Sequence, residues 1–223
     1  MASRRWAHRW AAPVTTAATA TTSARSDRTA VSTSIRIARE ADAAAIHAIY
    51  APHIATGVAT FETTLPGEDA MRERIRTRLP HYPWLVWEDG GEVLAYAYAG
   101  RFRERAAYDW IAETSIYVRP DGQRRGIARR LYGALLDTLV LQGLTQAVGV
   151  ITLPNPGSVG FHEALGFDPA GVWRQSGYKL GQWWDVGVWQ KELQPSANPP
   201  PAVTPFGMLA ATPELHALLD RNS

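Results

Sequence analysis

The segment 117–128 joins the end of a possible strand, a basic loop and the start of a possible helix. It reads YVRPDGQRRGIA. The first turn of a helix has backbone N–H groups without partners and the positive end of the helix dipole, so it attracts anions. Gly126 and the small Ala128 would let a diphosphate approach the backbone. Nearby positive charge comes from Arg124, Arg125, Arg129 and Arg130. The segment predicts a diphosphate-binding loop, with a solvated, arginine-rich first turn as the alternative.

Two side chains are candidates for proton transfer. Glu113 lies in the possible strand 110–118 among apolar and β-branched residues. Burial there would raise the pKa of its carboxyl, which would then accept a proton near neutral pH. A strand carboxylate paired with an arginine is the alternative. His162 lies on a possible short helix, 158–165, where an imidazole can donate or relay a proton, unless it is a structural histidine. The chain has no cysteine, which excludes a thiol nucleophile, disulfides and thiolate metal sites.

Two blocks of the sequence resemble the GCN5-related N-acetyltransferase (GNAT) superfamily. The residues QRRGIA at 123–128 are similar to its acetyl-CoA signature Q/R-x-x-G-x-G/A, and a second block follows at 155–167, ending EALGF. Within the superfamily, four blocks resemble the phosphinothricin N-acetyltransferase group, at 82–86, 107–110, 162–166 and 184–187. The resemblance covers about residues 35–193. It implies a homodimeric enzyme that uses acetyl-CoA to acetylate the amino group of a small, glutamate-like amino acid, such as phosphinothricin or methionine sulfoximine.

The same resemblance implies roles for single residues. Glu113 matches the glutamate regarded as the general base, and His162 stands where many members have a tyrosine that protonates the departing thiolate. The backbone N–H of Val118 would bond the thioester carbonyl at a point where the superfamily's strand separates from its neighbour. The remaining acetyl-CoA contacts would be Ile116, Tyr117, Arg124, Arg125, Gly126, Ile127, Ala128, Arg129, Asn155 and Phe161.

A loop between two predicted strands supplies candidates for binding the acceptor. Arg103 and Arg105 match a carboxylate or phosphinate with two-pronged geometry, and Tyr108 accompanies them. Phe61, between the first two predicted helices, is a further candidate. The alternative for this loop is a solvated set of arginines. Two other functions stay open: acetylation of a protein N-terminus, polyamine or aminoglycoside, and an acyl-CoA-binding regulator without catalysis.

These residues need an α/β (α+β) scaffold to position them. The sequence predicts strands over 35–38, 84–88, 92–100, 110–118, 145–151 and 186–191, the second and third joined by a tight turn at Asp89-Gly90-Gly91. Helical spacing predicts helices over about 42–54, 71–79, 127–141 and 158–165. Interleaved helices and strands indicate a central sheet of mixed direction. The resemblance implies the GNAT fold, in which that sheet is twisted, mostly antiparallel and flanked by helices.

Composition divides the chain into three parts. Residues 1–34 are rich in Ser, Thr, Ala and Arg, which predicts a disordered extension, with an organelle transit peptide as the alternative. Residues 35–193 form the predicted domain. Residues 194–223 form a predicted Pro-rich C-terminal tail with a possible short helix over 214–219.

Composition also limits the partners. The formal charge is +2, from 23 basic and 21 acidic residues, which is too even to predict a nucleic-acid partner. No stretch approaches the roughly 18–20 apolar residues of a membrane span. The absence of cysteine fits a cytoplasmic location. His47, His53 and His81 lack the spacing of metal ligands, so no metal is expected.

Overall fold

The computed structural model describes residues 33–223. The predicted disordered extension, 1–34, therefore lies outside the described residues except for its last two, which belong to the first strand. The strands are β1 (Thr33–Ile37), β2 (Trp84–Asp89), β3 (Glu92–Arg101), β4 (Ile111–Val118), β5 (Gln146–Leu153), β6 (Asp168–Lys179) and β7 (Gln182–Glu192). The helices are α1 (Ala43–Ala55), α2 (Glu68–Arg78), α3 (Ile127–Gln142), α4 (Pro156–Glu163), α5 (Phe206–Leu209) and α6 (Pro213–Asn222).

The strands form one seven-stranded sheet in the order β1-β2-β3-β4-β5-β7-β6. Every neighbouring pair is antiparallel except β4 and β5, which are parallel. The expectation of a mixed, mostly antiparallel sheet is thus confirmed. The parallel pairing covers only 111–113 against 146–148, although both strands continue beyond it. The middle of the sheet therefore opens beyond Glu113.

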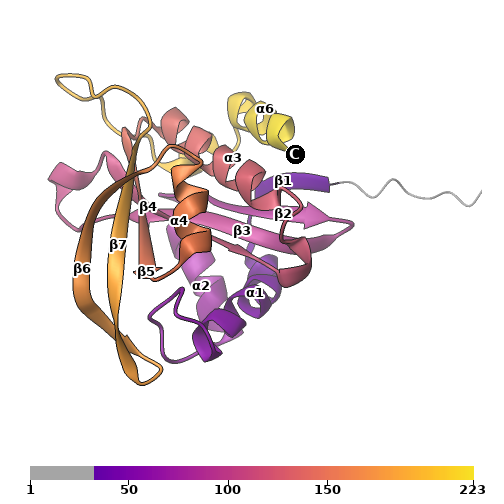
Figure 1. Ribbon diagram of the computed structural model, residues 1–223. Helices are drawn as coiled ribbons and strands as arrows, with labels where there is room; N and C mark the ends of the chain where they lie inside the picture. The colour runs from indigo at the N-terminus through magenta and orange to yellow at the C-terminus, as the bar shows by residue number, and fades with distance from the viewer. Residues whose placement is uncertain (1–32) are drawn as a thin grey trace, which may run out of the picture. The chain divides into compact units, whose positions relative to one another are not determined.

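Helices cover both faces of the sheet (Figure 1). Side chains alternate between the faces of a strand, and β2 shows this clearly. Trp84 and Val86 pack with α1 and α2, whereas Leu85 and Trp87 pack with α3 and α6. Tyr98 and Gly100 of β3 stand opposite Ser115 and Glu113 of β4, so the pocket described below lies on one face of the sheet, beyond the end of α2. Within residues 33–223, no helix is both long enough and apolar enough to cross a bilayer.

Residues 194–223 do not form the separate tail that the prolines predicted. They belong to the same compact unit as the rest of the described chain. In α6, Leu215, Leu218 and Leu219 are buried in the same core as α3, and Phe206 of α5 is buried as well. These leucines lie at i, i+3 and i+4, so they make an apolar stripe that needs cover. The Pro-rich residues are a connection to a packed helix.

Strand β6 is absent from the sequence-based prediction. Ten of its twelve residues are exposed, and its pairing with β7 has irregularities between Pro169 and Gly171 and between Trp173 and Gly177. An edge strand held mainly by backbone hydrogen bonds need not show a period of two in its side chains. The other predicted strands and helices exist, with bounds shifted by a few residues.

Leu218→Ala should lower the free energy of unfolding by about 2–5 kcal/mol, because it leaves a cavity in a buried contact. Leu218 is 4% exposed. Chemical denaturation measures the effect. Met208→Ala is the matched control, since Met208 is 70% exposed in the same segment and its truncation should cost less than about 0.5 kcal/mol. Equal stability of the two variants would show that α6 does not belong to the core.

Candidate active site

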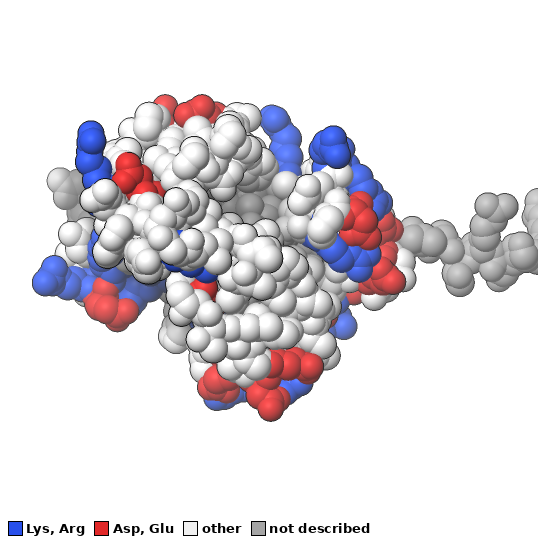
Figure 2. Space-filling view, turned by 60° about the horizontal axis from the view of Figure 1, so that its bottom comes forward, with Lys and Arg blue, Asp and Glu red and all other residues white. Residues whose placement is uncertain are grey.

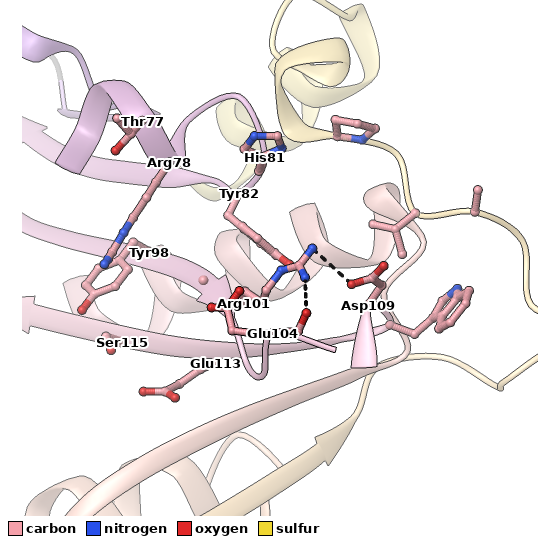
Figure 3. A pocket seen from close by; sticks show the side chains of 15 residues that line it. Thr77, Arg78, His81, Tyr82, Tyr98, Arg101, Glu104, Asp109, Glu113 and Ser115 are labelled. Atoms are coloured by element: carbon pink, nitrogen blue, oxygen red, sulfur yellow. Dashed lines mark hydrogen bonds and ion pairs between the residues drawn. The ribbon is translucent and has the colours of Figure 1, made fainter. Parts of the chain in front are cut away.

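A pocket of about 870 Å³ lies where the end of α2, β3, β4 and the C-terminal segment meet (Figure 3). Its wall holds both charged and aromatic side chains. Its lining residues are Thr77, Arg78, His81, Tyr82, Tyr98, Gly100, Arg101, Glu104, Asp109, Trp110, Glu113, Ser115, Ala202, Val203 and Pro205. It has the size and the mixed lining of a small-molecule site.

Glu113 is the predicted site residue that the structure places in this pocket. It is the last residue of β4 that pairs with β5, so its carboxylate lies where the sheet opens. Desolvation by burial raises the pKa of its carboxyl, and the charges of Arg103 and Arg78 lower it. Burial is the larger effect, so the carboxyl takes up a proton more readily than an exposed glutamate. This matches the environment expected of a general base.

Arg78 is a pocket residue that the sequence analysis did not identify. It comes from the end of α2 on one side of the pocket, while Glu113 comes from β4 on the other (Figure 3). Its guanidinium lies over the ring of Tyr98, with 5.8 Å from Cζ to the ring centroid. Among residues 33–223 it forms no salt bridge, whereas the other three arginines of α2 all do.

The sequence alone does not identify Arg78. Arg72 and Arg76 have acids three or four residues before them, at the spacing that pairs side chains on a helix. Arg74 and Arg78 have none, but Arg74 pairs with the distant Glu62, which leaves Arg78 without a salt bridge among residues 33–223. Its charge is therefore available to a ligand or to Glu113.

The loop 102–110 carries the predicted acceptor-binding residues. Arg103 lies over Phe102 and over Trp173 of β6, with 4.6 and 5.8 Å from Cζ to the ring centroids, and its charge acts on Glu113. Two further candidates, Arg105 and Tyr108, are exposed and do not line the pocket.

The end of β3 braces this loop. Arg101 pairs with Asp109 at 3.3 Å and donates to the carbonyl oxygen of Glu104 at 3.0 Å (Figure 3). Both partners are at the pocket, so these contacts fix the shape of the loop there.

Phe61 lies away from this pocket. Its ring packs so closely on Gly177 of β6 that an added Cβ there would clash with it. Nearby, the ammonium of Lys179 donates to the carbonyl oxygens of His53 (3.1 Å) and Thr60 (2.8 Å). These contacts join α1 and the loop that follows it to the β6–β7 hairpin, so Phe61 helps to position that loop.

The predicted anion loop has the expected backbone geometry. Gly126 is the N-cap of α3 with φ +79°, and no side chain caps the helix. A Cβ at Gly126 would meet nothing within 4 Å, so the space beside it is open. The N–H groups of Ile127, Ala128 and Arg129 belong to the first turn and lack helical partners. A diphosphate fits this arrangement.

Two of the four arginines predicted to lie near the diphosphate bind other groups of the protein. Arg125 pairs with Asp89 at 2.6 Å. Arg130 donates to the backbone carbonyl oxygens of the last two residues of the chain. Arg124 and Arg129 are exposed and form no salt bridge within the described chain. They are the cations that remain for a diphosphate.

The opening between β4 and β5 exposes one edge of β4. The N–H of Arg119 donates to the carbonyl oxygen of Leu94 of β3 at 2.8 Å. Because N–H groups alternate along a strand, those of Ile116 and Val118 point to the opposite edge, toward β5. That edge is not paired with β5 beyond Glu113. The Val118 N–H is therefore directed into the opening, as expected.

The side chain of Tyr117 points elsewhere. It is 8% exposed and packs against Tyr50, His53 and Tyr96 in the core beneath α1. By the same alternation its backbone N–H and C=O face β3, where Tyr117 pairs with Tyr96, so neither its side chain nor its backbone lies at the open edge.

His162 does not line the pocket with Glu113. It is 6% exposed, with Nδ1 2.8 Å from the carbonyl oxygen of Ser158 and Nε2 3.1 Å from the hydroxyl of Tyr132. The bond to a carbonyl requires a proton on Nδ1, so in the neutral ring Nε2 accepts from Tyr132. Burial lowers the pKa of the imidazole. Both ring nitrogens are thus engaged inside the protein.

The remaining two predicted contacts lie at α4. The side-chain oxygen of Asn155 accepts from the N–H of Ser158 at 3.1 Å and so caps this helix. Phe161 packs edge-on against Tyr132. Among residues 33–223 no three His, Asp or Glu side chains gather as a metal site would require.

Comparisons with known proteins indicate an acetyltransferase. The family model described as acetyltransferase (GNAT) domain matches residues 35–188. A phosphinothricin N-acetyltransferase from Streptomyces viridochromogenes is 41% identical over 167 residues, which cover 75% of this chain and 91% of the relative. An L-methionine sulfoximine/L-methionine sulfone acetyltransferase from Pseudomonas aeruginosa is 37% identical over 173 residues, covering 76% of this chain and 100% of the relative.

A solved structure shows the same fold. The phosphinothricin acetyltransferase from Sinorhizobium meliloti, in complex with acetyl-CoA, superimposes with a TM-score of 0.69 at 36% identity. The match covers 72% of this chain and 88% of that one. The open mixed sheet with helices on both faces is thus that of known GNAT proteins. The chain belongs to the acetyltransferase (GNAT) domain family and is an N-acetyltransferase.

Proposed function

We propose that the chain transfers the acetyl group of acetyl-CoA to the amino group of a small, glutamate-like amino acid, such as phosphinothricin or methionine sulfoximine. The observation that carries this proposal is a half-buried carboxylate with a raised pKa, that of Glu113, in a pocket that also holds the cation Arg78. The names of the two similar enzymes support the same acceptors. Another amine in the same pocket is the alternative.

The residues of the pocket suit direct attack by the amine. Acetyl-CoA, when bound, supplies the thioester. Glu113 takes a proton from the acceptor's ammonium group, which frees the lone pair of the nitrogen. As the C–N bond forms and the C–S bond breaks, the N–H of Val118 stabilises the developing oxyanion. The leaving thiolate takes a proton, and His162 as its donor stays a prediction.

Charge orients the acceptor in this scheme. Arg78 and Arg103 act on Glu113 from α2 and from the loop 102–110. Guanidinium groups bind carboxylates and phosphinates with two parallel hydrogen bonds. An acidic group held by them would keep the amino group next to Glu113. The exposed Arg105 and Tyr108 would join only if the loop moved.

The chain's own residues would hold acetyl-CoA at two places. The first turn of α3, with Gly126, Arg124 and Arg129, suits the diphosphate. The open edge of β4, at Ile116 and Val118, suits the pantetheine amides.

The predicted homodimer is also a proposal, and an exposed apolar surface supports it. At the β6–β7 turn, Tyr178, Leu180 and Trp183 are each between 56% and 59% exposed, and the rings of Tyr178 and Trp183 are in contact. The face that carries this turn, α1 and α2 is mostly uncharged at its middle, with charged residues toward its margins (Figure 2). Such patches mark interaction sites. Light scattering measures the mass in solution, and a monomer at micromolar concentration would contradict the homodimer.

The cytoplasmic location stays a prediction.

The test of the proposed function is thiol release from acetyl-CoA by the purified chain with a panel of amines. The panel includes phosphinothricin, methionine sulfoximine, glutamate, a polyamine, an aminoglycoside and a short peptide. We expect turnover with the first two. Turnover with only a cationic amine or a peptide would overturn the acceptor class, and acetyl-CoA binding without any turnover would overturn the reaction.

Arg78→Ala should move the acid limb of the pH profile of kcat/KM to higher pH. The charge of Arg78 lowers the pKa of Glu113, so its removal raises that pKa further, and a base must be ionised to act. Activity at neutral pH therefore falls and recovers as the pH rises. Arg76→Ala is the control, because Arg76 pairs with Glu73 on the exposed side of α2. An unmoved limb with a normal KM for the acceptor would exclude this role.

A further inference from the structure

The C-terminal segment forms one side of the pocket that holds Glu113. Ala202, Val203 and Pro205 line it together with the sheet and the end of α2. In Figure 3 this segment, pale yellow, borders the pocket on the side of His81, away from Glu113. The three residues are apolar, whereas the opposite end of the pocket is charged.

Hydrogen bonds fix the segment in this position. The indole N–H of Trp110 donates to the carbonyl oxygen of Pro201 at 2.7 Å. The N–H groups of Phe206 and Gly207 donate to the carbonyl oxygens of His81 (3.2 Å) and Pro80 (3.0 Å). These two acceptors belong to the loop that follows α2 and contributes to the pocket lining.

Gln142, the last residue of α3, ties the same two segments together. Its side-chain amide donates to the carbonyl oxygens of His81 (3.0 Å) and Thr204 (2.9 Å). It is 1% exposed. With Phe206 buried in the core, the segment has little freedom to swing away from the pocket.

This side of the pocket lies outside what the family shares. The family model ends at residue 188, before this segment begins. A property that depends on residues 201–207 is therefore a property of this chain beyond the family match.

We propose that residues 201–207 are a specificity element that closes the acceptor pocket at the end away from Glu113 and limits the length of the acceptor. This inference rests on the proposed function. An amino acid whose amino group lies at Glu113 would direct the end of its side chain toward Ala202 and Val203. A longer side chain would clash with residues 201–207, which the hydrogen bonds described above hold in place.

The first experiment measures length selection with a series of sulfones. The acceptors are methionine sulfone, ethionine sulfone and the S-propyl and S-butyl homocysteine sulfones, which differ by single methylenes. Ala202→Trp fills the end of the pocket, and we expect it to lower kcat/KM for the longer acceptors by about 10-fold or more relative to methionine sulfone. The KM for acetyl-CoA should not change. Ala211→Trp is the matched control, an exposed alanine of the same segment that does not line the pocket.

The outcomes separate the two proposals. If the unaltered chain acetylates no sulfone, the proposed acceptor class is wrong, and so is the limit that residues 201–207 would set on the acceptor. If it acetylates the series but Ala202→Trp and Ala211→Trp give the same ratios of kcat/KM along it, the inference about residues 201–207 is overturned. The proposed function is then unaffected.

A second experiment needs methionine sulfone alone and avoids any effect of a large side chain on folding. The chain has no cysteine, so Ala202→Cys introduces the only thiol. The folded variant is labelled with a benzyl methanethiosulfonate. We expect the label to raise the KM for methionine sulfone about 10-fold or more, as an occluded pocket requires, and to leave the KM for acetyl-CoA unchanged. A reductant should reverse the effect, and the same label at Ala211→Cys should do nothing. Complete labelling of Ala202→Cys with an unchanged KM for the acceptor would overturn the inference.

Discussion

Glu113→Gln should lower kcat for acetylation by about 10²- to 10⁴-fold, the range usual for the loss of a general base. Glutamine keeps the size of the side chain and its place in β4 but cannot accept the proton of the ammonium. Because burial raises the pKa of Glu113, the acid limb of the wild-type profile should lie above the ordinary glutamate range. That limb should disappear in the variant, whose rate would follow only the deprotonation of the free amine.

The measurement is the pH dependence of kcat and kcat/KM for both proteins. Glu104→Gln is the matched control. Glu104 also lies at the pocket, but its backbone carbonyl accepts from Arg101 and the residue is otherwise exposed. We expect nearly unchanged kinetics for the control. If Glu113→Gln kept the acid limb, another group would be the base.

Gly126→Val should raise the KM for acetyl-CoA by about 10- to 100-fold, because a hydrogen bond to a charged group contributes about 1.5–3 kcal/mol. Two effects combine. A β-branched residue is strained at φ +79°, and its side chain would occupy the open space at the start of α3. At saturating acetyl-CoA, kcat should be nearly kept, since the change does not touch Glu113.

Gly91→Val separates the two effects. Gly91 lies in the β2–β3 turn with φ +84° and has the same open space around it, so the variant has similar strain but no anion site. Both variants should lose comparable thermal stability, and only Gly126→Val should lose affinity for acetyl-CoA. A normal KM in Gly126→Val would exclude this loop as the diphosphate site.

The sequence predicted best those features that short segments determine by themselves. The start of α3 at Gly126 and its end at Gly143 follow from local backbone chemistry, and both glycines have positive φ. Glu113 could be identified because the apolar residues around it already imply burial. The turn residues 89–91 between two apolar runs predicted β2 and β3 for the same reason.

Features that depend on distant contacts could not be predicted. Arg105 and Tyr108 belong to a loop whose composition suits an acceptor site, yet the fold turns them to solvent. Arg78 reaches the pocket only because α2 ends there, which no local pattern states. The prolines at 199–201 predicted a separate tail, whereas residues further along the chain pack on the core. In each case the deciding partner is far away in sequence.

The two ends of α3 set a limit on how this chain can vary. At one end Gly126 opens the anion loop, and at the other Gln142 holds His81 and Thr204. A helix of 16 residues is about 24 Å long, so α3 is a rod of fixed length between the two sites. One residue inserted within it would turn its far end by about 100° and carry Gln142 away from both partners. One residue inserted at 195–198 would only lengthen an exposed connection. Insertions should therefore be accepted in that connection and rejected within α3.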